Sequence, residues 1–252
     1  MKATGLIETW TRPDVERAEG RDRAAIHAQM CDLAAWFVKN VAYSSSGSRF
    51  AVDHHDALAS RAFDEILADL SGKRYGATCA GLSLFMANMA RRHGYEAVEI
   101  NFGDNRAESH VLVLVTVGAG ERVFYDPTFG CFAGDADGRP LPVRTVIDLL
   151  RQRRSDELRW VEIGPCERTY LFGREERPEV PLISPVQELD QFRRVAMVNV
   201  KFHAAATWNG IWQWARQRQP EMRTVFDCLR FPLSTSGEAE AEAIADELRN
   251  IG

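Results

Sequence analysis

Hydrophobic residues recur at helical spacing through the first third of the chain, after a polar segment that covers residues 1–20. Between residues 22 and 41 they fall on one face, which predicts an amphipathic helix. A loop at 44–48 follows, and then a second helix runs to about Leu70, which Asp53 or Asp56 can cap by accepting hydrogen bonds from its first N–H groups. Two helices are therefore expected before the first strand.

A third helix is expected after a segment that contains glycine. Apolar residues at positions 82, 85, 86 and 89 have the spacing of one helix face. Thr78 precedes this run, and His93 and Gly94 follow it, since glycine is favoured just past the end of a helix. This places Cys79 at or just before the N-terminus of the helix.

The next segments alternate between strand and turn signals. Residues 97–102 predict one strand, and residues 111–117, nearly all apolar and rich in β-branched side chains, predict a central strand. A turn at 118–120 leads into a partner strand at 122–126, which Pro127 ends. The second and third of these segments therefore form an antiparallel hairpin.

Beyond the hairpin the pattern is weaker, with turns between 134 and 142, a helix at 143–153 and a strand at 195–202. We expect a tryptophan-rich helix around Trp208 and an amphipathic helix at 237–250. Helices followed by hairpin strands predict an α+β fold rather than a doubly wound sheet. In that fold the N-terminal helices and the third helix pack on an antiparallel β-sheet.

Composition and charge narrow the classes of function. The chain has 252 residues, of which 45% are hydrophobic, so residues 21–252 can form a single domain around a sizeable core. A net charge of −5 gives no electrostatic reason to expect nucleic acid or a membrane as a partner. No apolar run approaches the roughly 20 residues of a spanning helix, and we find no secretory signal.

The five cysteines lie far apart, at positions 31, 79, 131, 166 and 228, and no Cys-x-x-Cys pair occurs. This spacing argues for reduced thiols in the cytoplasm rather than for a disulfide framework or a zinc site. The adjacent residues His54 and His55 would point apart on one element, so they make a poor metal site. We expect a cytoplasmic protein without a metal or other cofactor.

Cys79 is the first candidate for chemistry. A thiolate, the reactive form of cysteine, is stabilised at a helix N-terminus by unpaired N–H groups and by the helix dipole. Those N–H groups can also receive the oxyanion of a tetrahedral intermediate, and Gly76 and Gly81 would let a substrate approach the backbone beside Thr78. The alternative is a small core residue, because free cysteine is among the most buried residue types.

His110 and Asp126 favour the catalytic interpretation of Cys79, because the predicted hairpin brings these two residues together. If the turn centres on Gly118, His110 faces Asp126 directly. If it centres on Ala119, His110 lies diagonal to Asp126 on the same face, whereas an odd register would put the two on opposite faces. An aspartate beside a histidine holds one tautomer and leaves the other nitrogen for a thiol, as in a catalytic triad. The alternative is a surface histidine and a turn-forming aspartate.

Four segments, in this order, resemble the transglutaminase-like superfamily, a branch of the papain-like cysteine enzymes. They are residues 75–81, which contain Gly-x-x-Cys, and residues 92–97, 109–111 and 124–130. In that family Gly-x-x-Cys opens a helix, the histidine begins a strand, and the aspartate ends the next strand, commonly in Asp-Pro-Thr, as here. The resemblance covers roughly residues 60–131, and the remainder of the domain is expected to shape the substrate cleft.

The resemblance implies a papain/transglutaminase-like fold and a cysteine-dependent acyl-transfer enzyme. Cys79 would be the nucleophile that forms an acyl-thioester, His110 the general base and acid, and Asp126 the residue that orients His110. The acyl donor would be a peptide, an amide or a carrier-protein thioester. An amine acceptor gives an acyltransferase or amide synthase, and water gives a protease or amidase. The alternative within the superfamily is a catalytically silent module that binds a partner or serves as a scaffold.

Other residues are weaker candidates. Tyr75 or Arg74 would supply a side-chain donor to the oxyanion hole, and Trp208 would wall the substrate cleft. Cys131 would either line the site or belong to the core. Residues 135–138 resemble the opening of a calcium loop, but no acid stands at the required twelfth position, so a turn is expected.

Overall fold

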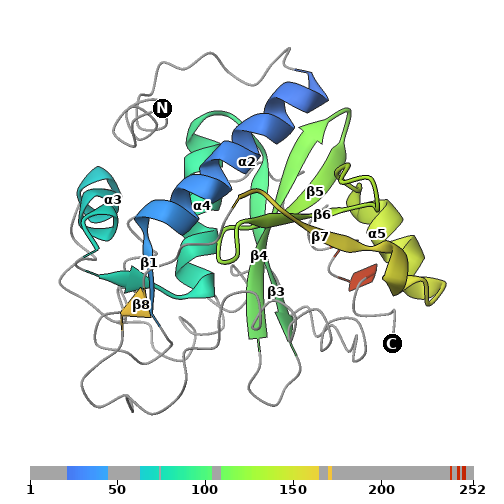
Figure 1. Ribbon diagram of the computed structural model, residues 1–252. Helices are drawn as coiled ribbons and strands as arrows, with labels where there is room; N and C mark the ends of the chain where they lie inside the picture. The colour runs from blue at the N-terminus through green and yellow to red at the C-terminus, as the bar shows by residue number, and fades with distance from the viewer. Residues whose placement is uncertain are drawn as a thin grey trace, which may run out of the picture.

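The computed structural model describes residues 22–44, 63–73, 75–103, 109–164 and 170–171, together with 239, 243–244 and 246–247. Within them, helices stand beside a five-stranded antiparallel sheet, so the predicted α+β class is confirmed (Figure 1). The helices are α2 (Arg23–Asn40), α3 (Phe63–Ser71), α4 (Cys79–Arg92) and α5 (Val143–Arg151). The strands of the sheet, in spatial order, are β3 (Ala97–Gly103), β4 (Ser109–Gly118), β5 (Glu121–Asp126), β6 (Cys131–Gly134) and β7 (Arg159–Glu162).

Side-chain caps set the starts of the two long helices. Asp22 accepts a 2.7 Å hydrogen bond from the N–H of Ala25 at the start of α2. Thr78 accepts one from the N–H of Gly81 at 3.2 Å, so α4 begins at Cys79. Each cap satisfies a backbone donor that has no partner within its own helix.

The C-terminal end of α4 is fixed to the sheet. Gly94 follows the helix in the left-handed conformation, with φ +79°, as glycine does after a helix end. In the last turn, the guanidinium of Arg91 donates to the carbonyl oxygen of Ala97 at 2.7 Å and to Oε1 of Glu99 at 3.1 Å. Both charged side chains are buried, so this ion pair holds α4 against β3.

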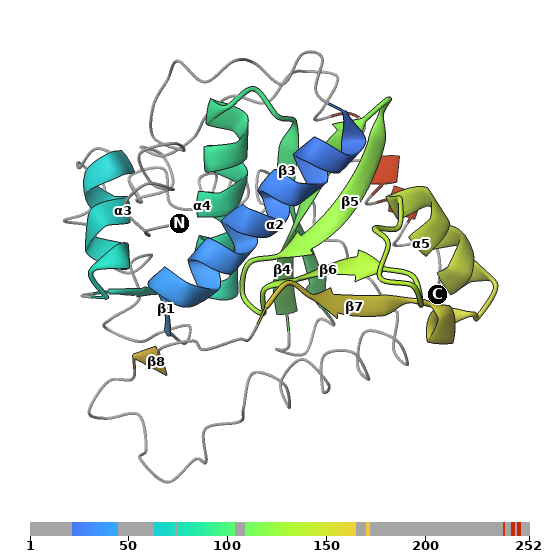
Figure 2. The same cartoon turned by 45° about the horizontal axis from the view of Figure 1, so that its top comes forward.

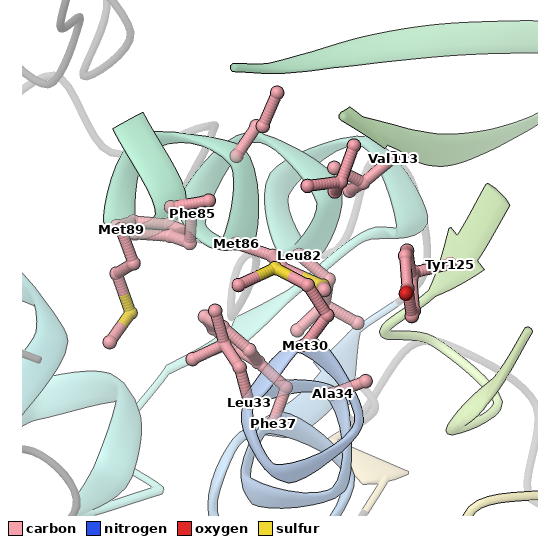
Figure 3. Close-up of a cluster of buried hydrophobic side chains, with 14 of the residues drawn as sticks. Met30, Leu33, Ala34, Phe37, Leu82, Phe85, Met86, Met89, Val113 and Tyr125 are labelled. Atoms are coloured by element: carbon pink, nitrogen blue, oxygen red, sulfur yellow. The ribbon is translucent and has the colours of Figure 1, made fainter. Parts of the chain in front are cut away.

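The sheet separates two hydrophobic clusters. In the first, α2 and α4 cover one face, and Figure 3 shows Met30 and Phe37 of α2 meeting Leu82 and Met86 of α4 beside the sheet. In the second, α5 covers the other face (Figure 2). Odd-numbered residues of β4 contribute to the first cluster and even-numbered ones to the second, as the alternation of a strand requires. Burial of each large apolar side chain stabilises the fold by about 1.5–3 kcal/mol.

Next to the site, the β4–β5 hairpin has the second of the two registers considered from the sequence, since Val113 pairs with Tyr125 and Thr116 with Arg122. At the tip, Gly118 pairs with Glu121 around a two-residue turn of Ala119 and Gly120, which is the odd register, and an irregularity between Thr116 and Gly118 shifts the pairing back to the even one. Ala119 has a positive φ of 43° and lies between two glycines that also have positive φ. The register next to the site puts His110 and Asp126 on one face of the hairpin, diagonal to each other.

The sequence pattern does not predict two parts of the fold. β6 and β7 pair across a long connection, with Phe132 opposite Val161. A second, parallel sheet has the order β2 (Gly76–Ala77), β1 (Ala42–Ser44) and β8 (Tyr170–Leu171). Strands of two to four residues are too short to show a periodic pattern.

Several predicted segments fall outside the described residues, including the start of the second helix, the strand at 195–202 and the helix around Trp208. The described part of α3 ends at Ser71, close to the predicted end, and α5 stops at Arg151. In the segment predicted as the C-terminal helix, the described residues are helical, and Ile244 is buried in the second cluster. Among the residues that the structure describes, no helix has the length and apolar character to cross a membrane.

Candidate active site

Cys79 is the first residue of α4 and is partly exposed. The carbonyl oxygen of Thr78 accepts the first bond of the helix from the N–H of Leu82 at 2.8 Å. The N–H groups of Cys79 and Ala80 precede this bond, so the helix does not use them. These donors and the helix dipole stabilise negative charge beside the thiol. The predicted position of Cys79 at a helix N-terminus is therefore confirmed.

His110 and Asp126 form a buried pair at the end of the hairpin. Nε2 of His110 lies 2.7 Å from Oδ2 of Asp126, and the Asp126 side chain has no exposed surface. The contact confirms that the hairpin places these two side chains on one face. Because Nε2 is engaged by Asp126, Nδ1 is the ring nitrogen left for another partner.

A tight turn after β5 holds the Asp126 carboxylate from its other side. Oδ1 accepts hydrogen bonds from the N–H groups of Thr128 at 2.7 Å and Phe129 at 3.2 Å. The carbonyl oxygen of Asp126 accepts a further bond from Gly130 at 2.8 Å. Gly130 has φ +65°, and a side chain there would meet Val38 of α2 at 2.7 Å. The turn thus commits one carboxylate oxygen to the backbone and leaves the other for the histidine.

The environment of His110 favours its protonated form. Burial lowers its pKa, but the charge and hydrogen bond of Asp126 raise it, as do a hydrogen bond with Cys79 and the charge of that residue, so the pKa is raised to about 10. This interaction makes Cys79 a direct neighbour of the imidazole and brings the three predicted residues together. The ring of Phe129 lies against His110, with 5.3 Å between the centroids.

The sequence pattern does not identify Phe129 as a site residue, although it contacts both His110 and Asp126. Its N–H binds Asp126 and its ring packs on His110. The available signal was local, because an aspartate side chain commonly accepts N–H bonds from the residues that follow it in a turn.

The other described cysteines have different surroundings. Burial, together with the charge of Asp32, raises the pKa of Cys31 to about 12, so this thiol stays protonated at neutral pH. Cys131 has no exposed surface, belongs to the second cluster and lies opposite Asp126 in the β5–β6 pairing. Cys131 is therefore a core residue that packs beside the strand end at Asp126.

The predicted substrate-side residues have structural contacts of their own. Gly76 is buried in β2, where a side chain would meet Cβ of Ser44 at 2.7 Å, so glycine permits the close approach of β1. The Thr78 hydroxyl caps α4, and Tyr75 packs partly buried against the first cluster. Contact of these residues with a substrate stays a prediction. Two further candidates lie outside the described residues, namely Arg74 and Trp208.

The predicted turn that begins at Asp135 is confirmed. Oδ1 of Asp135 accepts hydrogen bonds from the N–H groups of Asp137 at 2.9 Å and Arg139 at 2.8 Å. In the part of the chain that the structure describes, no group of three or more His, Cys, Asp or Glu side chains is arranged to hold a metal ion. His54 and His55 lie outside that part.

No family model matches the chain, and comparisons with curated proteins and with solved structures return no match either. The case for a function therefore depends on the geometry of Cys79, His110 and Asp126, and on the sequence motifs that contain them.

Proposed function

We propose that this protein is a cysteine-dependent acyl-transfer enzyme with a papain/transglutaminase-like active site. The observation that carries the proposal is the position of His110 between two partners. Asp126 lies 2.7 Å from Nε2, and Cys79, the first residue of α4, is near enough to the ring to help raise the pKa of His110. A nucleophile, a base and an orienting carboxylate in this order form a triad. The N–H groups at the start of α4 add donors for a developing oxyanion.

In the first half-reaction, the Cys79 sulfur attacks the carbonyl carbon of the acyl donor and forms a C–S bond. The carbonyl electron pair moves onto oxygen, and the N–H groups at the helix start stabilise this oxyanion. The oxyanion then collapses, the bond to the leaving amine or thiol breaks, and protonated His110 gives its proton to the leaving group. An acyl-thioester on Cys79 and a neutral His110 result.

In the second half-reaction, an amine or a water molecule attacks the thioester carbonyl, and neutral His110 accepts the proton that the acceptor loses. The C–S bond breaks, the sulfur leaves as a thiolate, and the imidazolium–thiolate pair is restored. Asp126 holds the ring in place and stabilises its positive charge in both half-reactions. Water as the acceptor gives a carboxylic acid, and an amine gives a new amide.

The proposal extends to the class of donor and to the compartment. The donor is a peptide, an amide or a carrier-protein thioester, since each offers a carbonyl with a leaving group that His110 can protonate. The cytoplasm is the compartment proposed, because it keeps a cysteine nucleophile reduced.

An activated phenyl ester tests the proposal without knowledge of the natural donor, because it acylates any competent cysteine nucleophile. We expect a burst of about one phenol per chain, with the acyl group mapped to Cys79. Cys79→Ala and His110→Ala should lose the burst. His93→Gln, which changes a histidine at the other end of α4, should retain it.

The outcomes of this experiment are distinct. A burst that survives in Cys79→Ala contradicts the mechanism. A folded wild-type protein without any burst indicates the catalytically silent binding module instead. Addition of glycinamide then distinguishes an amine acceptor from water. Amide formation with faster turnover indicates an acyltransferase, and a turnover rate that glycinamide does not change indicates a hydrolase.

A further inference from the structure

Ser83 links the helix that carries Cys79 to the strand that carries His110. It lies one turn beyond Cys79 in α4, and its hydroxyl donates a 2.7 Å hydrogen bond to the carbonyl oxygen of Val111 in β4. Val111 is the residue directly after His110. Ser83 has no exposed surface, so water does not compete for this bond.

The bond is unusual for a polar side chain inside a helix. Such side chains commonly bond a carbonyl one turn earlier in their own helix. Asn88, farther along α4, does this, since its amide nitrogen donates to the carbonyl oxygen of Leu84 at 2.8 Å. Ser83 reaches across to the sheet instead, and so it joins α4 to β4 by a directional contact.

The direction of the backbone groups in β4 follows from a bond near its other end. The N–H of Thr116 donates to the carbonyl oxygen of Glu96 at 2.9 Å, on the side of β3. In an antiparallel ladder, successive residues turn their backbone groups to opposite neighbours. The backbone N–H and C=O groups of even-numbered residues of β4 therefore point toward β3. Those of odd-numbered residues, including Val111, point toward β5.

On the β5 side, the ladder lacks a donor for Val111. Val113 pairs with Tyr125, and extending this register by two residues puts Val111 opposite Pro127, the residue just past the end of β5. Proline has no N–H and cannot donate to the ladder. The proline that ends β5 thus leaves a buried carbonyl, and the Ser83 hydroxyl satisfies it.

We propose that Ser83 is a positioning residue that fixes the Cys79 thiol against the imidazole of His110. The proposal rests on the proposed function of these two residues as nucleophile and base. One helical turn separates Cys79 from Ser83, and one peptide bond separates Val111 from His110. A single hydrogen bond therefore connects the backbones that carry the two reactive side chains. Apolar packing between α4 and the sheet is non-directional, so it resists sliding of the helix over the sheet less than this hydrogen bond does.

Loss of this bond should separate or misalign the two reactive side chains. A displacement of about 1 Å between reacting groups costs about 10²-fold in rate. Ser83→Ala should therefore slow the alkylation of Cys79 by iodoacetamide near neutral pH by about 10-fold to 10²-fold. The rising limb of the alkylation rate against pH should also move to higher pH, because His110 no longer stabilises the thiolate.

Val115→Ala is the matched control. Val115 has no exposed surface and lies in β4 within the first cluster, so its truncation lowers the thermal midpoint without removing the Ser83 bond. Cys79 in this variant should keep the wild-type alkylation rate and pH profile. Ser83→Cys keeps a weak donor of similar size, should give an intermediate rate, and replaces Ser83→Ala if that variant does not fold.

Slow alkylation of Cys79 in Ser83→Ala, with normal alkylation in Val115→Ala, supports the positioning role. Wild-type rate and pH profile in a folded Ser83→Ala overturn it and leave the proposed function standing. Equal slowing in both variants also overturns it, because loss of stability alone then explains the effect. A wild-type Cys79 that reacts no faster than an ordinary cysteine overturns the proposed function, and the positioning role with it.

Discussion

Replacing Asp126 by asparagine perturbs the electrostatics of the site and leaves its shape nearly unchanged. The amide oxygen can still accept the N–H bonds of Thr128 and Phe129 that Oδ1 accepts in the wild type. The amide nitrogen then stands where Oδ2 lay, 2.7 Å from Nε2 of His110. An amide nitrogen only donates, so Nε2 must become the acceptor and the ring proton must move to Nδ1.

That tautomer is wrong for the proposed reaction, because a protonated Nδ1 cannot accept a proton from Cys79 or from the acceptor. Burial continues to lower the pKa of His110, while the charge of Asp126, which helps to raise it to about 10, is lost. The imidazolium is therefore depopulated as well. The corresponding change in a serine protease triad costs about 10⁴-fold in kcat, so we expect acylation of Cys79 to fall by about 10³-fold to 10⁴-fold.

The assay is the burst of phenol from an activated ester, followed from acidic to alkaline pH for the wild type, Asp126→Asn and His110→Ala. Circular dichroism and the thermal midpoint establish that each variant is folded. We expect the acylation rate of Asp126→Asn to approach that of His110→Ala at every pH. A folded Asp126→Asn that acylates at the wild-type rate would refute the orienting role of Asp126.

Three further predictions concern stability. Gly130→Ala should lower the free energy of unfolding by at least about 1–2 kcal/mol, because φ is +65° and the added methyl group meets Val38 at 2.7 Å; an unchanged midpoint in urea would contradict this. Tyr125→Phe should cost about 0.5–1.5 kcal/mol, because the buried hydroxyl lies 2.7 Å from Nδ1 of His27, and a wild-type thermal midpoint would argue against that bond. Folding raises the pKa of His110 to about 10, so its stabilising contribution is complete below about pH 6.5 and is lost as the pH rises toward 10. His110→Gln should therefore lose more stability in acid than in alkali, and the opposite trend in urea titrations would show that the sign is wrong.

The sequence predicts the elements that carry the site because their local signals are strong. The cap at Thr78 and the helical spacing after it locate Cys79, and the apolar run of β4 followed by glycines locates the hairpin. The register is harder to predict, because the two-residue turn of Ala119 and Gly120 would by itself put His110 and Asp126 on opposite faces. An irregularity between Thr116 and Gly118 restores the register that puts them on one face, and the sequence pattern does not indicate it.

The sequence does not predict β6 and β7, the two strands at the other end of the sheet from β3. β6 and β7 have four residues each, and Cys131 lies opposite Glu162 across a long connection. A segment of four residues fits a strand or a loop equally well, and its pairing is decided by packing against neighbours. For this reason the sequence pattern predicts α5 between them but not the two strands.

Two polar contacts of α4 cannot be predicted from the sequence pattern. Arg91 has the charge expected in the last turn of a helix, but its bond to Glu99 depends on how α4 lies over β3. Pro127 shows in the sequence that a ladder donor is missing. Only the crossing of α4 over β4 reveals that Ser83 replaces it.

The pairing of Cys79 with His110 is tested by the rate at which each of the five cysteines reacts with iodoacetamide near neutral pH, measured by peptide mapping. We expect Cys79 to react first and His110→Ala to slow its reaction. Cys31, whose pKa is raised to about 12 by burial and by Asp32, and the buried Cys131 should stay unmodified in both proteins. A Cys79 that reacts no faster than these cysteines, or at a rate that His110→Ala does not change, would contradict the claim that Cys79 and His110 act as a catalytic pair.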